Sequence, residues 1–347
     1  MEELRGKPLA ELDAIIQRLG FPGYRAKQVF HWLYKHGVRH IDEMSNLPMG
    51  LRRALVAHYR LGGVEIAATQ TAHDGTCKIL FRLDDGCYIE GVLMRENGRT
   101  TLCVSSQVGC PLACSFCLTG MRGFKRNLRT AEIVDQMITV QRELLAGQRP
   151  HNLVFMGMGE PLLNLEMVIP ALRLLTSPQA VGISTRRVTV STVGIVPGIH
   201  ALGEARTGVN LAVSLSATTD EVRTRLIPIN AQYPISAVTE ACREFPLTRR
   251  RRITFEYVLL AGVNDSADDA RRLVKLVHGI PCKINLIPYN PCPSIPYTAP
   301  AADVIDEFRS ILTAKHFTVA VRYSKGGEIQ AACGQLAGHC CGQRSGS

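Results

Sequence analysis

The sequence contains no long apolar run. No stretch approaches the roughly 18 uninterrupted apolar residues that a membrane-spanning helix needs. The first residues, MEELRGKPLAELDAII, carry charges instead of the apolar segment of a signal peptide. Internal repeats and low-complexity tracts are also missing, which argues against a repeat architecture. We therefore expect a cytoplasmic, monomeric protein without a membrane partner.

The pattern of a disulfide scaffold is missing too, although the chain has 12 cysteines. Such scaffolds are typical of short secreted chains, whereas these cysteines are spread over 347 residues, which indicates a reducing compartment. A chain of this length favours one large domain with an accessory piece, and a hydrophobic content of 46% supports a sizeable core. Acidic residues are in deficit, and the formal net charge of +10 indicates a polyanionic partner.

Residues 1–60 have the pattern of a small helical domain. Apolar residues recur at helical spacing over 9–19, and Gly20, Pro22 and Gly23 end that run. The next stretch, YRAKQVFHWLYKHGVRH, places basic side chains around an apolar stripe. Two interpretations of this stretch stay open: a solvated helix face, and a surface that contacts an RNA backbone.

The pattern changes to strands after this segment. Residues 61–100 predict a β-hairpin extension, because alternating segments such as KILFRL and CYIEGVLM are separated by the turn sequences DDG and ENG. Over 101–338, apolar segments suited to buried strands alternate with helical segments. That order implies an α/β fold with a parallel sheet, most simply a barrel or partial barrel whose active site lies at the carboxyl ends of the strands. Residues 339–347 are expected to form a flexible tail.

The most informative stretch is CVSSQVGCPLACSFC, in which Cys110, Cys114 and Cys117 have the spacing C-x3-C-x2-C. One short loop can therefore aim three thiolates at a single inorganic centre. A structural zinc site closes with four protein ligands, and cubane iron–sulfur clusters are usually held by four cysteines. Three ligands thus favour a cluster that leaves one iron open for a substrate or cofactor. The alternatives are a zinc site completed by a distant side chain, or three buried thiols.

Four motifs occur in order along the chain: CVSSQVGC, GMGEPLLN, INLIPYNP and AACGQLAG. The three-cysteine loop, with Phe116 before its last cysteine and GMGEP after it, resembles the radical S-adenosylmethionine superfamily. The four motifs together resemble, more narrowly, the RlmN/Cfr family of adenosine methyltransferases. The resemblance implies a six-stranded partial (β/α)6 barrel, an N-terminal helical accessory domain that contacts RNA, and methylation of carbon 2 or carbon 8 of an adenosine in 23S rRNA.

The resemblance also implies cofactors and the residues that bind them. A [4Fe-4S] cluster would be bound by Cys110, Cys114 and Cys117, and its open iron would bind S-adenosylmethionine, of which each turnover uses two molecules. An electron donor such as flavodoxin would reduce the cluster. The residues expected to hold the amine of the cofactor and to line the rest of its site are Gly159, Glu160, Ser191, Ser214, Leu215, Ser216 and Asn290.

Two further cysteines match the family's catalytic pair. Cys333 matches the cysteine that takes a methyl group from one cofactor molecule and passes it on as a methylene. Cys103 matches its partner, which attacks that sulfur and releases the product as a disulfide forms. Glu90 stands at the family's position for the base that takes the ring proton. The sequence context of Glu90 alone favours a strand carboxylate that faces solvent.

We predict a carbon-2 methyltransferase of 23S rRNA, with the adenosine next to the tRNA anticodon as a second substrate, because a small residue follows Leu336 in AACGQLAG. A carbon-8 methyltransferase is one alternative. A non-catalytic RNA-binding protein with a structural metal site is another, but it leaves Cys103, Cys333 and GMGEP unexplained. The chain departs from the usual family pattern at SLSA, STVG and GEI. Because every cysteine of the mechanism is present, we interpret these departures as variation within an active enzyme.

Overall fold

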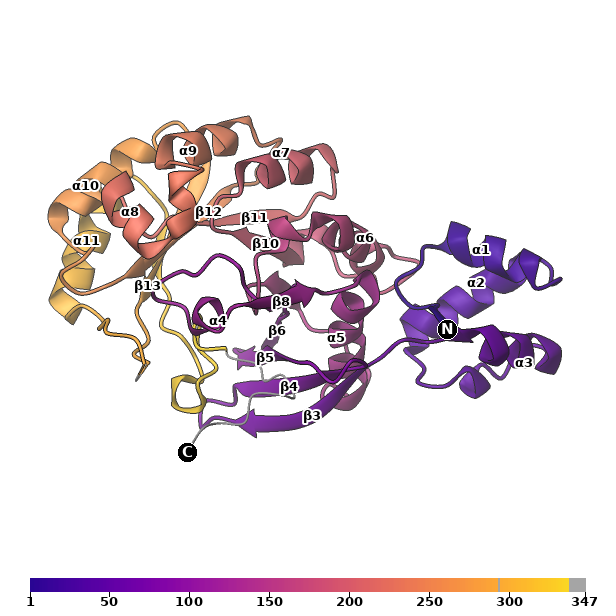
Figure 1. Ribbon diagram of the computed structural model, residues 1–347. Coiled ribbons are helices and arrows are strands. Elements are labelled where there is room, and N and C mark those ends of the chain that lie inside the picture. Colours follow the sequence, from indigo (N-terminus) through magenta and orange to yellow (C-terminus); the bar gives the residue numbers. More distant parts are fainter. Residues whose placement is uncertain (293, 337–347) are drawn as a thin grey trace.

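Most strands form one mixed sheet in the computed structural model, which describes residues 1–292 and 294–336, and two small sheets pair β1 with β2 and β7 with β8 (Figure 1). Within these residues the sheet has ten strands in the order β14-β13-β12-β11-β10-β9-β6-β5-β4-β3. Its parallel part contains the six strands of the predicted partial barrel, and the short strand β14 continues beyond them. These strands are β6 (Arg99–Cys103), β9 (Asn152–Phe155), β10 (Val188–Thr192), β11 (Asn210–Ser214), β12 (Ile253–Leu259), β13 (Cys282–Pro288) and β14 (Val319–Val321).

Helices alternate with the parallel strands and lie on the outer side of the curved sheet (Figure 1). Leu211, Phe255 and Ile284, on three successive strands, are 0% exposed, as expected where parallel strands are covered on both faces. The predicted α/β fold is therefore confirmed, and the barrel stays open because β14 and β3 are edge strands. The covering helices are α5 (Thr130–Glu143), α6 (Leu165–Thr176), α7 (Val196–Glu204), α8 (Asp220–Leu226), α9 (Ile235–Glu244), α10 (Ala267–Leu276) and α11 (Ala302–Ala314).

The predicted hairpins extend the same sheet on its antiparallel side. β3 (Val64–Thr71), β4 (Cys77–Leu83) and β5 (Tyr88–Glu96) pair antiparallel in sequence, and β5 pairs with β6. In the ENG turn, Asn97 has φ 48° and Gly98 has φ 71°, the left-handed pair that a tight hairpin turn requires. Because β5 bonds directly to β6, the hairpin extension becomes a side wall of the barrel.

The N-terminal segment is helical, as its periodicity predicts, and packs beyond α5 (Figure 1). Its Arg5 forms a buried ion pair with Asp135 of α5, and Asp135 also accepts a hydrogen bond from the backbone of Val64 at 2.8 Å. Loss of one partner of a buried ion pair typically costs about 3–5 kcal/mol, so this contact binds the segment firmly to the sheet. The elements of the segment are β1 (Glu2–Glu3), α1 (Leu9–Arg18), α2 (Tyr24–His31), a π-helical turn (Trp32–His36), α3 (Met49–His58) and β2 (Tyr59–Arg60).

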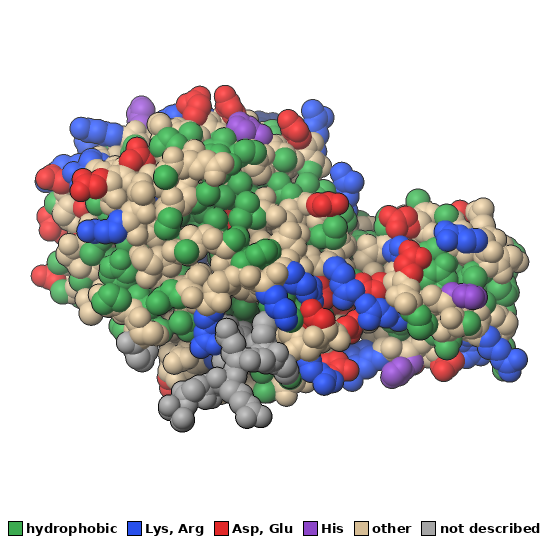
Figure 2. Space-filling model, viewed as in Figure 1, with side chains coloured by type: hydrophobic (Ala, Val, Ile, Leu, Met, Phe, Trp, Pro, Cys, Tyr) green, Lys and Arg blue, Asp and Glu red, His purple; other side chains and the backbone are tan. Residues whose placement is uncertain are grey.

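Charged pairs complete the junction between this segment and the rest of the molecule. Glu3 accepts from Arg60 and from Arg129, each at 2.8 Å, and Arg60 also pairs with Asp84 at 2.7 Å. Figure 2 shows basic and acidic side chains interspersed near the middle of this face. The junction therefore contains the buried ion pair between Arg5 and Asp135, and partly exposed ion pairs lie around its rim.

None of the helices in the described part of the chain is long and apolar enough to cross a membrane. The tail expected over 339–347 lies outside the described residues.

Candidate active site

Short elements frame the three-cysteine loop at the carboxyl end of the sheet: β7 (Gln107–Gly109), α4 (Leu118–Met121) and β8 (Phe124–Asn127). Gly109 has φ 78°, and a Cβ atom there would lie 2.0 Å from the carbonyl oxygen of Gly123. Only glycine allows so close an approach. The backbone N–H of Cys110 donates to that same carbonyl at 2.9 Å, so the loop begins at a fixed position.

Two distant segments hold the loop from outside. The N–H of Ser115 donates to the carbonyl of Leu226, at the end of α8, at 3.0 Å. The N–H of Leu118 donates to the carbonyl of Gly334 at 2.7 Å. The second bond brings Cys333, the neighbour of Gly334, next to the loop although the two are far apart in the sequence.

The predicted motifs converge on one cavity. Its wall contains the thiols of Cys110, Cys114 and Cys117 together with Cys333. The same wall includes Gly159 and Glu160 from GMGEP, and Ser191, Ser214 and Asn290 from the ends of successive strands. This convergence follows from the rule that active sites of such sheets lie at the carboxyl ends of parallel strands.

The donor set fits a cluster better than a single metal ion. A structural metal ion closes with four protein ligands, whereas the loop supplies three thiols to the cavity. Burial raises the pKa of Cys110 to about 12 and that of Cys114 well above its usual range, and a coordinating metal deprotonates such thiols. The buried hydroxyl of Tyr289, in the cavity wall, has no hydrogen-bond partner in the described structure, so a bound cofactor would supply one.

Glu160 is held rigidly for contact with a cationic group. Its carboxylate accepts from the backbone of Leu162 at 3.0 Å and of Val193 at 2.9 Å, and its own N–H donates to Gln107 at 2.8 Å. Gly159 beside it has φ 97°, and a Cβ there would lie 2.5 Å from the Gln107 side chain. Burial raises the pKa of Glu160 to about 7 although its hydrogen bonds oppose the shift, and among the described residues no cation forms an ion pair with it. An ammonium group in the cavity would provide that missing charge.

Leu215 and Ser216 differ from the other residues predicted to contact the cofactor. Both are 0% exposed, and neither belongs to the cavity wall, although Ser214 before them does. Ser216 has φ 51°, and its hydroxyl accepts from the backbone of Val258 at 3.4 Å. The two residues therefore shape the turn after β11 from behind the wall.

Cys103 and Cys333, the cysteine pair that the family resemblance implies, lie near enough for their charges to interact. Cys103 is the last residue of β6 and is 6% exposed, whereas Cys333 is exposed in the cavity. Burial and the proximity of Cys333 raise the pKa of Cys103 far above that of an ordinary thiol. Although Cys333 is open to the cavity, the protein atoms around its sulfur desolvate it, and this desolvation, with the charges of Glu256 and Cys117, raises the pKa of Cys333 to about 11. Both are free thiols in the structure.

Glu90 does not face solvent, so the prediction from its sequence context alone is wrong. It is 8% exposed, and its carboxylate lies 3.7 Å from the ammonium group of Lys78. On β6 Cys103 pairs with Val92, and Glu90 stands two residues from Val92 on β5. Side chains two residues apart on a strand point to the same face, so Glu90 and Cys103 share one face of the sheet.

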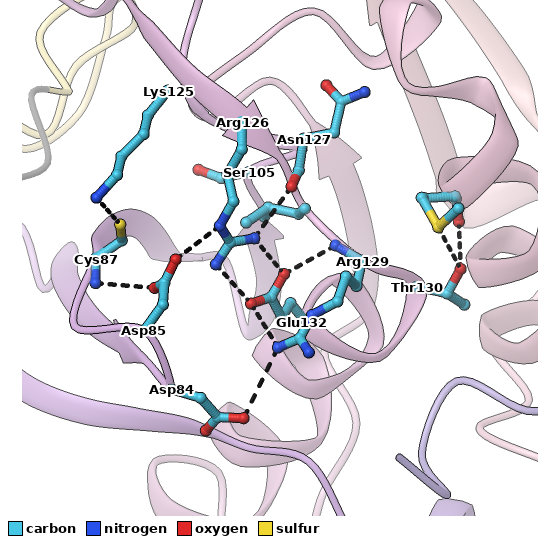
Figure 3. A network of polar contacts seen from close by, with 12 residues as sticks. Asp84, Asp85, Cys87, Ser105, Lys125, Arg126, Asn127, Arg129, Thr130 and Glu132 are labelled. Atoms are coloured by element: carbon cyan, nitrogen blue, oxygen red, sulfur yellow. Dashed lines mark hydrogen bonds and ion pairs between the residues drawn. The ribbon is translucent and has the colours of Figure 1, made fainter. Parts of the chain in front are cut away.

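An ion-pair network supports β8 beside the three-cysteine loop (Figure 3). The guanidinium of Arg126 donates to Asp85 at 2.8 Å and to both oxygens of Glu132, at 2.8 and 2.9 Å. Arg129 also donates to Glu132, at 3.0 Å. The ammonium of Lys125 lies 2.8 Å from the sulfur of Cys87. These contacts join β8 to α5 and to the turn between β4 and β5.

Sequence reasoning missed Glu256, an acid in the cavity wall. It is 7% exposed and accepts from the amide of Asn285 at 2.9 Å, and burial raises its pKa. The signal was available, because ITFEYVLL carries one acid in an otherwise buried strand. Such an acid requires a polar partner or a functional role.

Comparison with known proteins defines the class first. Residues 104–274 match the radical SAM superfamily model, which agrees with the open parallel sheet and the three-cysteine loop. A crystal structure of a radical SAM methyltransferase from Sphaerobacter thermophilus has a TM-score of 0.92 and 44% identity, and the match covers 97% of this chain and 99% of that one. The chain is thus a radical S-adenosylmethionine enzyme whose cofactors are a [4Fe-4S] cluster and S-adenosylmethionine.

The particular family follows from closer relatives. Residues 2–61 match the ribosomal RNA large subunit methyltransferase N-terminal domain. The dual-specificity RNA methyltransferase RlmN of Geobacter sulfurreducens is 52% identical over 338 residues, which is 97% of this chain and 92% of that protein. The RlmN protein of Geotalea uraniireducens is 50% identical, over 97% and 96% of the two chains. The chain belongs to the RlmN family, so the predicted family is confirmed.

Proposed function

We propose that the enzyme methylates carbon 2 of an adenosine in 23S rRNA and of the adenosine next to the tRNA anticodon. The observation that carries this proposal is the convergence of Cys333 and Cys103 beside the cavity of the three-cysteine loop. Support for two RNA substrates comes from the relatives, which are named dual-specificity RNA methyltransferases. The relatives in this family do not favour the carbon-8 alternative.

The cavity suits chemistry that ordinary methyl transfer cannot do. An adenine ring carbon is electron-poor and carries no acidic proton, so transfer of an electrophilic methyl group to it is unfavourable. When bound, the cluster and S-adenosylmethionine supply an electron and a radical, together with the methyl group itself. The protein has to hold the reacting groups in place and exclude water. Gly159, Glu160, Ser191, Ser214 and Asn290 would hold the cofactor against the wall.

Cys333 and Cys103 then act in turn. The exposed thiol of Cys333 would take the methyl group and carry it to the adenine as a methylene bridge. The buried thiol of Cys103 would attack the Cys333 sulfur, which breaks the bond to the methylene and forms the disulfide. Glu90, on the same face as Cys103 and paired with Lys78, would take the ring proton.

The direct test is mass spectrometry of digested rRNA and tRNA from cells with and without the protein. We expect 2-methyladenosine in both RNAs only when the protein is present. Cells that carry the Cys333→Ala variant provide the matched control and should lack the modification. Detection of 8-methyladenosine would overturn the choice of ring carbon. Modification of rRNA without tRNA would overturn the second substrate.

The remaining partners follow from the same chemistry. An enzyme whose cluster must be reduced needs a small electron carrier such as flavodoxin, and its RNA substrates place it in the cytoplasm. We infer that it acts as a monomer. We also infer that residues 1–60 form the accessory domain that contacts RNA, that 61–100 form the β extension and that the catalytic domain begins near residue 101.

Two cations lie side by side where the N-terminal segment faces the large domain. A Cβ atom on Gly182 would lie 2.8 Å from Nη1 of Arg149 and 3.5 Å from Nζ of Lys35. Burial and the charge of Arg149 lower the pKa of Lys35. Neither cation forms an ion pair within the described residues, although Arg149 donates to the carbonyls of Val181 and Gly182 at 2.9 and 2.6 Å. The tilted rings of Trp32 and His36, on the same turn as Lys35, have centroids 4.4 Å apart. Unpaired cations beside aromatic rings are typical of a surface that binds an RNA backbone.

We expect the double variant Lys35→Ala/Arg149→Ala to bind substrate RNA more weakly. Each lost phosphate contact should reduce the slope of log K against log salt by about 0.7–0.9, hence by about 1.5 for the pair. Filter binding at several salt concentrations measures the slope. The double variant Arg271→Ala/Arg309→Ala removes two exposed cations from α10 and α11 and should bind as the unmodified protein does. Equal slopes for all three proteins would exclude the contact.

A further inference from the structure

Arg223 of α8 is a fully buried cation. Its side chain is 0% exposed, and every hydrogen bond that it donates goes to a neutral acceptor. Nε donates to the carbonyl of Leu215 at 3.0 Å, and Nη1 donates to the amide oxygen of Asn230 at 2.8 Å. Nη2 donates to the carbonyls of Val193 and Ser214. Among the described residues no carboxylate accepts a hydrogen bond from it.

Such a cation needs a negative charge nearby. Carbonyl dipoles satisfy its donors but leave the net charge in place, and a buried charge is costly unless a countercharge offsets it. The nearest acid in the network is Asp220, an exposed residue that reaches Arg223 only through the Asn230 amide, at 3.1 Å. Because the Asp220 carboxylate is solvated and does not contact Arg223 directly, it offsets little of the positive charge of the Arg223 guanidinium.

The position of Arg223 indicates where the countercharge lies. Val193 and Ser214, whose carbonyls it binds, belong to the wall of the cavity that contains the three thiols. Its helix also ends on the loop, because the carbonyl of Leu226 accepts from the N–H of Ser115. A guanidinium group stays protonated at neutral pH, so Arg223 is a permanent positive charge behind the cavity wall.

We propose that Arg223 is the internal countercharge of the iron–sulfur cluster, and that it favours the reduced cluster while it holds two strand ends against the cavity. A [4Fe-4S] core of charge +2 with three thiolates carries −1, and one added electron makes it −2. A fixed positive charge in a low-dielectric site stabilises the second state more than the first. Arg223 is a positioning residue, because it acts through the cluster and not on the substrate. The inference rests on the cluster of the family and is independent of which RNA carbon is methylated.

The test is an anaerobic redox titration of reconstituted protein with dithionite, followed by electron paramagnetic resonance, without RNA. We expect Arg223→Gln to shift the midpoint potential of the cluster to more negative values, and Arg223→Lys, which keeps the charge, to stay near the unmodified protein. Arg271→Gln, which removes an exposed guanidinium of α10, is the matched control and should not shift the potential. Loss of iron from Arg223→Gln alone would also support the proposal.

A second variant leaves Arg223 in place, in case Arg223→Gln does not fold. Asn230→Asp, made with Asp220→Asn because the Asp220 carboxylate lies 3.1 Å from the Asn230 amide nitrogen, puts a carboxylate at the oxygen that accepts from Nη1. The Thr224 hydroxyl, 2.9 Å from that nitrogen, can turn to donate to the second oxygen. The new charge should neutralise the guanidinium and shift the potential in the same negative direction. An unchanged potential in Asn230→Asp and Arg223→Gln would overturn the proposal. A second pair of results would also overturn the proposal. If the potential of Asn230→Asp is unchanged, and Arg223→Gln and Arg223→Lys lose iron equally, then Arg223 has a purely structural role.

Discussion

Cys103→Ala is expected to accumulate a protein–RNA complex that survives denaturation, whereas Cys333→Ala should form none. The exposed thiol of Cys333 can still receive the methyl group and bond to the adenine when Cys103 is absent. The resolving thiol of Cys103 is then no longer there to break the carbon–sulfur bond, so protein and RNA stay joined. Both variants should lose methylation completely. A denaturing gel of each protein purified from cells, with and without ribonuclease, measures the outcome.

Two further variants sharpen this experiment. Glu90→Ala should slow release and leave part of the protein in the complex, because breakdown of the adduct needs removal of the ring proton. Cys242→Ala removes a buried cysteine of α9, away from the cavity wall, and should methylate normally without a complex. If Cys103→Ala migrates as free protein and still fails to methylate, the assigned order is wrong. Cys103 would then act before the carbon–carbon bond forms.

Replacement of Cys110, Cys114 or Cys117 by alanine should abolish iron retention and methylation together. If these three cysteines are the protein ligands of the cluster, as we propose, the loss of any one leaves a second iron without a protein ligand and exposes the cluster to loss. Iron and sulfide content and the visible absorbance, measured after anaerobic reconstitution, report the result. The unmodified protein should contain four iron atoms per chain.

The same assay distinguishes a cluster from a structural metal. Cys242→Ala is again the matched control, because it removes a buried thiol that is not in the cavity wall, and it should retain iron fully. One zinc ion per chain without iron–sulfur absorbance would contradict the cluster. That result would restore the zinc interpretation that the cysteine spacing alone leaves open.

Much of the fold could be predicted because its signals are local. Asn97 and Gly98 specify a hairpin turn through their own backbone preferences. The strands that contain Phe255 and Ile284 can be predicted from their nearly continuous apolar residues, because both faces of such a strand are buried. The small sheet of β7 and β8 was not predicted. Its β8 strand, FKRN, is mostly polar, and it pairs only because the three-cysteine loop returns to Gly109.

The chemistry of the loop is likewise a property of the sequence. The spacing of Cys110, Cys114 and Cys117 alone brings three thiolates within one short turn, because few bonds separate them. The glycine at 109 is also local, since only glycine tolerates the approach of the Gly123 carbonyl. The motifs and their order were sufficient to identify the family.

The tertiary structure alone decided which distant groups meet. Cys333 lies near Cys103 because the carbonyl of Gly334 accepts a hydrogen bond from Leu118 of the three-cysteine loop. Glu90 is buried because β5 pairs with β6. Glu256 and Arg223 gain their roles from burial, which a single strand or helix cannot specify. The physical reason is that spacing and turn preference act over a few residues. The dielectric environment and countercharge of a group depend on every segment that packs around it.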